Sequence, residues 1–132
     1  IDTTRITLRG GSFGSFVTTH LLTGIKAGKF KNIFNGVHCC GGVKYPIAAE
    51  MPDNIPILIA HSINDPIAKF SNARQFMEQL LLMNLVREKN GQATQQIQTI
   101  VSETGNHHMI ATHLTNEMKE SKEFNEMRHY LE

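Results

Sequence analysis

Cysteine is scarce in this 132-residue chain, and the only two cysteines, Cys39 and Cys40, are neighbours. Neighbouring cysteines cannot link distant segments and match no metal-ligand spacing, so we expect neither a disulfide framework nor a cysteine-based metal site. No apolar run approaches the ~20 residues needed to cross a membrane, and no signal-peptide pattern opens the chain. The net charge is only +1 and no basic run is present, so nothing indicates a nucleic-acid partner.

The hydrophobic residues, 40% of the chain, follow the pattern of alternating strands and helices. Short apolar or β-branched runs predict strands at residues 3–9, 30–39, 55–61 and 96–102. Apolar positions spaced by three and four predict helices at residues 14–27, at 66–90 and in the charged segment after 108. Residues 41–54 are expected to form a loop or a single helical turn. The predicted fold class is α/β, with a mainly parallel sheet flanked by helices and right-handed crossovers.

Polar clusters follow three of the predicted strands, at Ser12, Asp65 and His107. The carboxyl ends of parallel strands meet at one edge of a sheet, and sites in such sheets form there. We therefore expect this edge to collect three side chains that are far apart in the sequence.

Residues 10–14 read Gly-Gly-Ser-Phe-Gly, which fits the G-x-S-x-G pattern of a nucleophile elbow. In an elbow the serine lies on a strained turn between a strand and a helix, where tight packing leaves little room for a Cβ on either side. The helix that follows offers free N–H groups, and that of Phe13 is placed to bind an oxyanion. The alternative is a glycine-rich turn in which Ser12 only caps the helix. Phosphate-loop patterns do not fit these residues.

A serine hydroxyl needs a histidine to accept its proton and a carboxylate to orient that histidine. Asp65 is the candidate acid, because it follows the apolar strand expected at 55–61 and precedes His107 and His108 in the chain. The competing interpretation makes Asp65 the N-cap of a helix that starts at Pro66. Glu50 and Asp53 are weaker candidates, since they precede that strand and belong to the opposite end of the sheet.

The candidate base is His107 or its neighbour His108, only one of which is expected to face Ser12 from an extended loop. The alternatives are a solvated pair or a chance metal site with His113, but no carboxylate-containing metal motif accompanies these histidines. We therefore expect no metal and no cofactor. A cysteine nucleophile at Cys39 would lack an elbow. The remaining histidines are interpreted as structural: His20, His38, His61 and His129.

Three segments resemble the closing half of the α/β-hydrolase fold: RITLRGGSFGSF, IPILIAHSINDPIAKFSNARQFMEQL and ETGNHH. Within that superfamily they look most like the prolyl oligopeptidase-like group, whose motifs are G-G-S-x-G-G after an arginine-containing strand, H-G-x-x-D and a late G-H. The resemblance favours His107 over His108 as the base. The chain departs from these motifs at Ser15, Ser62 and Asn106, each of which replaces a glycine. It keeps the three positions that carry the chemistry.

The resemblance implies a serine hydrolase that acts through an acyl-enzyme on a peptide or ester substrate, with Ser12 as nucleophile, Asp65 as acid and His107 as base. It also implies that residues 1–132 are part of a catalytic domain, because the strands before the elbow and the loop with the second oxyanion N–H are absent. The expected partner is the missing N-terminal portion of the same fold. The alternatives are a carboxylesterase or thioesterase, or a non-catalytic hydrolase-like binding domain.

Overall fold

The computed structural model describes residues 2–42, 48–103 and 107. Its elements follow in the order β1 (Thr7–Gly11), α1 (Phe13–Lys26), β2 (Gly36–Cys40), the 3-10 turn η1 (Ala48–Glu50), β3 (Ile57–Ser62), α2 (Phe70–Lys89) and β4 (Ile97–Ser102). The four strands form one sheet in the order β1-β2-β3-β4, and each neighbouring pair is parallel. The expected α/β fold class with a parallel sheet is confirmed. The helix expected after residue 108 lies outside the described residues.

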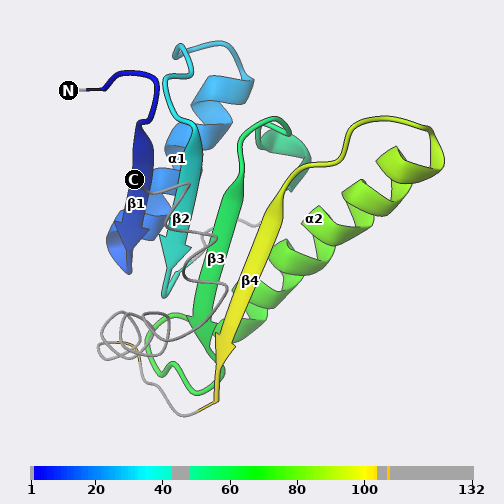
Figure 1. Ribbon diagram of the computed structural model, residues 1–132. Coiled ribbons are helices and arrows are strands. Elements are labelled where there is room, and N and C mark those ends of the chain that lie inside the picture. The colour runs from blue at the N-terminus through cyan, green and yellow to red at the C-terminus, as the bar shows by residue number, and fades with distance from the viewer. Residues whose placement is uncertain (1, 43–47, 104–106, 108–132) are drawn as a thin grey trace.

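Both helices and η1 lie behind the sheet in the view of Figure 1. α1 carries the chain from β1 to β2, and α2 carries it from β3 to β4. The carboxyl ends of the four parallel strands therefore lie at the same edge of the sheet, at the bottom of the view. Neither of the two described helices has the length and apolar character that a membrane span requires.

The first two strands are displaced from their predicted bounds. β1 begins at Thr7, because Asp2 closes a turn by accepting the N–H groups of residues 4 and 5. β2 begins at Gly36, and the stretch predicted to start it at residue 30 is a local turn. There the side chain of Asn32 bonds to the N–H and the C=O of Phe34, so neither group is available for hydrogen bonds to a neighbouring strand.

The helix predicted to start at Pro66 begins instead at Phe70. The N–H groups of residues 67 and 68 both bind the Asp65 carboxylate, which folds the intervening segment as a turn. The N-cap position of α2 belongs to Lys69, whose side chain makes no cap bond. The interpretation of Asp65 as the N-cap of this helix is therefore wrong, although its carboxylate does bind backbone N–H groups.

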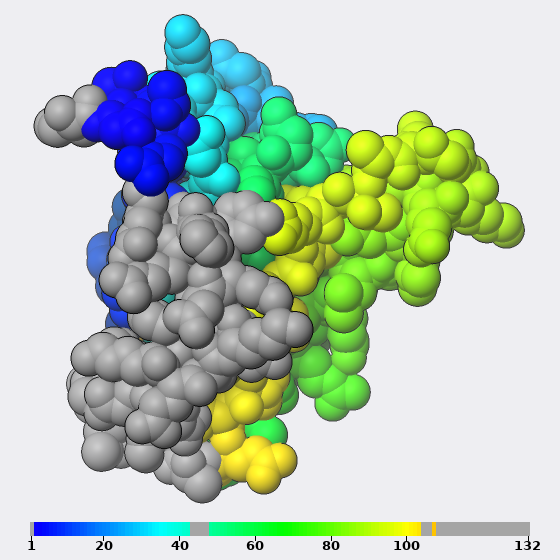
Figure 2. All heavy atoms as spheres, viewed as in Figure 1, coloured from blue at the N-terminus to red at the C-terminus, as the bar shows by residue number. Residues whose placement is uncertain are grey.

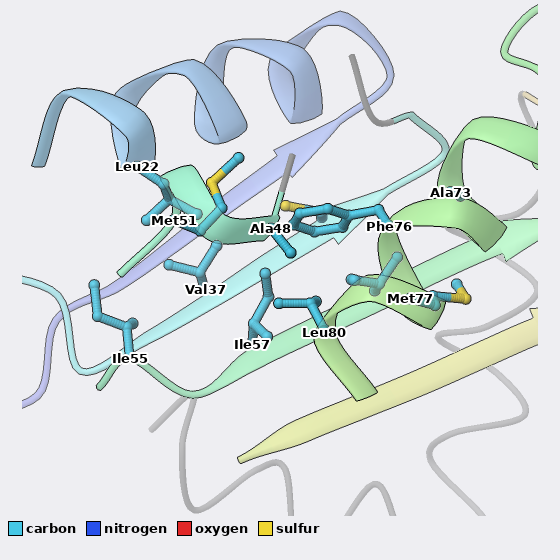
Figure 3. Packing of buried hydrophobic residues seen from close by; sticks show 12 residues of the cluster. Leu22, Val37, Ala48, Met51, Ile55, Ile57, Ala73, Phe76, Met77 and Leu80 are labelled. Atoms are coloured by element: carbon cyan, nitrogen blue, oxygen red, sulfur yellow. The ribbon is translucent and has the colours of Figure 1, made fainter. Parts of the chain in front are cut away.

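The core lies between the sheet and the layer formed by α1, η1 and α2 (Figure 3). β2 and β3 are buried at every position, which is typical of parallel strands covered on both faces. Phe76 of α2 is 0% exposed, and its ring lies against Ala48 of η1. Burial of a side chain of this size contributes about 2–3 kcal/mol, so this contact helps to hold α2 and the loop before it in place.

The end of α2 and the connection to β4 project from the body of the molecule in Figure 2. Four apolar side chains on this part of the helix are about half exposed or more: Leu81, Leu82, Leu85 and Val86. Leu81 is 49% exposed although it belongs to the apolar spacing that predicts this helix. The fully buried core positions of α2 end at Leu80, and beyond it Met83 is only partly buried against the core.

Candidate active site

Ser12 lies on the turn between β1 and α1 with φ 52° and ψ −119°, and among the described residues it is the only non-glycine with positive φ. Such a conformation costs about 1–3 kcal/mol and persists only where the surroundings fix it. Here the Ser12 N–H donates to the Cys40 carbonyl at 2.8 Å, and the Ser12 carbonyl accepts the Ser15 N–H at 3.0 Å. The Ser12 hydroxyl makes no cap bond to α1, so it is free to face the strand edge.

Close packing explains one of the two glycines, Gly10 and Gly14, that begin and end the G-x-S-x-G motif. A Cβ at Gly10 would lie 2.3 Å from the Gly14 carbonyl oxygen and 2.4 Å from Thr18 Oγ1, which is shorter than such atoms can approach. A Cβ at Gly14 would meet no described atom within 4 Å. The steric reason given for both positions therefore applies to Gly10 and is wrong for Gly14.

The structure brings Ser12, His107 and Asp65 into one hydrogen-bonded row. Ser12 Oγ lies 2.6 Å from His107 Nε2, and His107 Nδ1 lies 2.7 Å from Asp65 Oδ2. These residues follow β1, β4 and β3 respectively, so the common edge of the parallel sheet collects them. His107 and Asp65 are both buried. The alternative base His108 lies outside the described residues.

The row has a defined direction of hydrogen bonding. An ionised carboxylate can only accept, so His107 Nδ1–H donates to Asp65 and Nε2 of the neutral ring is left to accept the Ser12 O–H. In this arrangement the ring can take the proton from Ser12 Oγ as the oxygen attacks an electrophile, while the carboxylate stabilises the resulting imidazolium. The geometry is thus suited to activating Ser12 as a nucleophile.

The two oxygens of Asp65 have separate partners. Oδ1 accepts the N–H groups of Ile67 and Ala68, each at 2.8 Å, while Oδ2 faces His107. Burial raises the pKa of Asp65, but the hydrogen bonds from His107, then those from the Ala68 and Ile67 backbone, outweigh it and leave the pKa below its usual range. Asp65 is therefore a carboxylate near neutral pH, as the row requires.

Phe13 is the first residue of α1, so its N–H has no acceptor within the helix. This N–H directly follows the nucleophile candidate and lies at the positive end of the helix dipole, where it suits a developing oxyanion. The Phe13 ring is 73% exposed and contacts Phe16 edge to face, with 6.3 Å between the ring centroids.

Glu50 and Asp53, the weaker candidates for the acid, lie away from His107. Glu50 belongs to η1 and Asp53 to the loop that leads into β3, so both come before the strand whose carboxyl end carries Asp65. Asp53 Oδ2 lies 3.7 Å from an amino group of Arg87, at the far end of α2. Asp65, not Glu50 or Asp53, is the carboxylate that bonds to His107.

The adjacent cysteines do not form a thiolate site. Burial raises the pKa of the Cys39 thiol to about 12 and also raises that of Cys40, whereas a nucleophilic cysteine needs an accessible thiolate. The neighbouring His38 cannot serve as a base for Cys39, because successive side chains of a strand point to opposite faces. Burial, reinforced by the charge of Arg9, lowers the pKa of His38 to about 4, and neither of its ring nitrogens has a hydrogen-bond partner among the described residues.

Two residues that support the site were not predicted to belong to it. Ser15 is fully buried, and its hydroxyl donates to the Gly42 carbonyl, which ties α1 to the turn after β2. His61 was interpreted as structural, yet its Nε2 lies 3.3 Å from Asp65 Oδ2. The H-x-x-x-D spacing at the end of β3, part of the H-G-x-x-D motif, was the signal that could have linked His61 to the acid.

No candidate metal centre is found in the part of the chain that the structure describes, since no three His, Cys, Asp or Glu side chains are grouped so as to hold an ion. His113, which entered the alternative metal interpretation, lies outside that part.

No protein-family model and no curated protein sequence matches the chain. Solved structures do match. The chain is similar to Pyrococcus horikoshii acylaminoacyl peptidase, with a TM-score of 0.62, 18% identity, and coverage of 98% of this chain and 25% of that one. An acylaminoacyl peptidase in complex with Z-Gly-Gly-Phe-chloromethyl ketone matches with a TM-score of 0.56 and 16% identity, over 82% of this chain and 20% of that one. A thermostable esterase matches with a TM-score of 0.54 and 24% identity, over 80% of this chain and 24% of that one.

These similarities establish the fold: the described chain has the architecture of an α/β-hydrolase over the part that it spans. The chain spans about a quarter of the length of the peptidase from Pyrococcus horikoshii.

Proposed function

We propose that this chain carries the catalytic residues of a serine hydrolase, with Ser12 as nucleophile, His107 as base and Asp65 as acid. The observation that supports it most directly is the row from Ser12 Oγ to His107 Nε2 at 2.6 Å and from His107 Nδ1 to Asp65 Oδ2 at 2.7 Å. A serine that only capped α1 would direct its hydroxyl to the helix N–H groups, and Ser12 makes no such bond.

The proposed reaction proceeds through an acyl-enzyme. Ser12 Oγ attacks the carbonyl carbon while His107 Nε2 takes the hydroxyl proton, and the carbonyl oxygen becomes an oxyanion facing the Phe13 N–H. Collapse of this intermediate expels the alcohol or amine, which receives the proton from His107. Water then attacks the ester of Ser12 with the same histidine as base, releasing the acid and restoring the hydroxyl.

We infer a peptide or ester as the substrate, in the manner of the prolyl oligopeptidase-like group. Two of the structural neighbours are named as acylaminoacyl peptidases and a third as an esterase. Hydrolysis of a peptide and hydrolysis of an ester are both acyl-transfer reactions. A carboxylesterase or thioesterase would use the same three residues, because the triad does not select the leaving group.

We also propose that residues 1–132 are one part of the catalytic domain and act with an N-terminal portion of the same fold. Within the described residues β1 is an edge strand, paired only with β2, although it carries the proposed nucleophile. A second oxyanion N–H would come from that portion. If no such portion completes the site, the non-catalytic binding domain becomes the better interpretation.

A fluorophosphonate probe tests the proposal, since it reacts with activated serines and not with ordinary ones. The full-length protein should be labelled, the Ser12→Ala variant should not, and the Ser71→Ala variant, which alters an exposed serine of α2, should be labelled as the wild type is. Labelling that persists in Ser12→Ala, or a folded wild type that is never labelled, would contradict the proposal.

A further inference from the structure

His61 is a buried histidine that contacts the acid of the proposed triad. Its ring is 1% exposed and packs against Phe70, with 5.9 Å between the ring centroids. Nε2 lies 2.8 Å from the Ala68 carbonyl oxygen and 3.3 Å from Asp65 Oδ2, the same oxygen that binds His107. One nitrogen of His61 thus faces two acceptors.

The partners of His61 determine which nitrogen carries the proton. A backbone carbonyl can only accept, so Nε2 must be protonated and must donate. The other nitrogen, Nδ1, is buried and has no hydrogen-bond partner among the described residues. A proton on Nδ1 would therefore be a buried donor without an acceptor, which is unfavourable, so the neutral ring holds its single proton on Nε2.

Two hydrogen bonds and one 3.3 Å contact link His61, Ala68 and Asp65. The Ala68 N–H donates to Asp65 Oδ1, while the Ala68 C=O accepts from His61 Nε2. His61 belongs to β3, whereas the other two residues lie on the turn that follows it. The histidine therefore anchors the turn to the rigid strand and places its N–H next to the oxygen that orients His107.

We propose that His61 is a positioning residue for Asp65: its Nε2–H fixes the 65–68 turn and faces Oδ2, so that the carboxylate holds His107 in line with Ser12. This proposal rests on the proposed function. His61 touches neither substrate nor nucleophile, and its effect on the reaction passes through Asp65.

Two substitutions of similar shape separate the hydrogen bond from the packing. In His61→Gln the amide nitrogen is as many bonds from Cβ as Nε2 is, so a donor is kept near Ala68 and Asp65. In His61→Met the side chain has similar length and no donor. For the full-length protein acting on an activated ester, we expect His61→Met to lower kcat about 10- to 100-fold, by analogy with the loss of partners that orient metal-ligating residues. We expect KM to change less than about 2-fold. His61→Gln should recover most of the loss.

A role limited to packing predicts other results. It predicts that the two variants lose stability to similar extents and that the folded fraction of each, measured by thermal unfolding, accounts for its activity. Equal kcat values for folded His61→Gln and His61→Met would overturn the proposal, and so would a loss confined to KM.

The protonated nitrogen can be observed without any variant and without turnover. In full-length protein labelled with ¹⁵N-histidine, the shifts of His61 should show a proton on Nε2 and none on Nδ1. A proton on Nδ1 would overturn the proposal even if His61→Met failed to fold. Failure of the proposed function is recognised separately, because a wild type that shows the expected His61 shifts but reacts with no fluorophosphonate contradicts the function and leaves the hydrogen bonding intact.

Discussion

Replacing Asp65 with asparagine changes the chemistry of one oxygen while leaving the other in place. Oδ1 accepts two backbone N–H groups at 2.8 Å, which only an oxygen can do, so the amide of the Asp65→Asn variant is held with its oxygen in that position. The amide NH₂ then replaces Oδ2, 2.7 Å from His107 Nδ1 and 3.3 Å from His61 Nε2. The turn keeps its main contacts, and His107 meets a donor instead of an acceptor.

The consequence for His107 follows from its two nitrogens. To accept from the amide, Nδ1 must give up its proton, and Nε2–H then points at Ser12 Oγ and cannot remove a proton from it. In serine proteases the equivalent aspartate-to-asparagine change in the triad lowers kcat about 10⁴-fold. We expect a similar loss here, equivalent to about 5 kcal/mol of transition-state stabilisation.

The assay is hydrolysis of an activated ester by full-length protein, with thermal unfolding measured on the same samples. Asp53→Asn is the matched control, because that carboxylate lies before β3 and pairs with Arg87. It should leave kcat unchanged. If Asp65 only supported the turn, an asparagine would do so about equally well, since Asn and Asp bind backbone N–H groups with similar strength. Near-normal turnover in a folded Asp65→Asn variant would therefore refute the reasoning.

Two further predictions concern the elbow and the sheet. Gly10→Ala should abolish fluorophosphonate labelling, because its Cβ would fall 2.3 Å from the Gly14 carbonyl oxygen, and Gly14→Ala should be labelled normally, because its Cβ meets no described atom. Equal labelling of the two variants would contradict this. The free energy of unfolding should fall by about 3 kcal/mol between pH 6.5 and 4. In the unfolded chain His38 takes up a proton within this window, whereas burial keeps the ring of the folded protein neutral down to a pKa of about 4. In urea titrations His38→Leu should lack this part of the pH dependence, and an unchanged dependence would show that His38 does not titrate in this way.

The order of the fold could be predicted because its signals are local. Apolar runs marked β3 and β4 to within two residues of their observed bounds, and the spacing of apolar residues identified α1 and α2 as helices. The candidate site could be located for a related reason: parallel strands bring their carboxyl ends together whatever the length of chain between them. Knowing that Ser12 and Asp65 each followed a strand was enough to place them at one edge.

The contacts that shape the site could not be predicted, because they depend on side chains meeting in three dimensions. The buried Ser15 hydroxyl bonds to the Gly42 carbonyl across two elements, and no local pattern in the sequence specifies that distance. Likewise, the space around Gly14 cannot be measured from the sequence, so the elbow pattern suggested a packing constraint there that the described atoms do not impose.

The turn that precedes the displaced start of α2 also supplies contacts of the site. In a helix beginning at Pro66 the Ala68 carbonyl would accept the N–H four residues on, so His61 would have to share that acceptor. In the structure the Ala68 N–H binds the Asp65 carboxylate, the Ala68 carbonyl binds the His61 ring, and α2 begins at Phe70. The same contacts occupy Asp65 Oδ1 and leave Oδ2 directed at His107. A variant whose helix begins at Pro66 is expected to weaken the bond between the Ala68 carbonyl and His61, and with it the contact that helps to align the acid in the proposed mechanism.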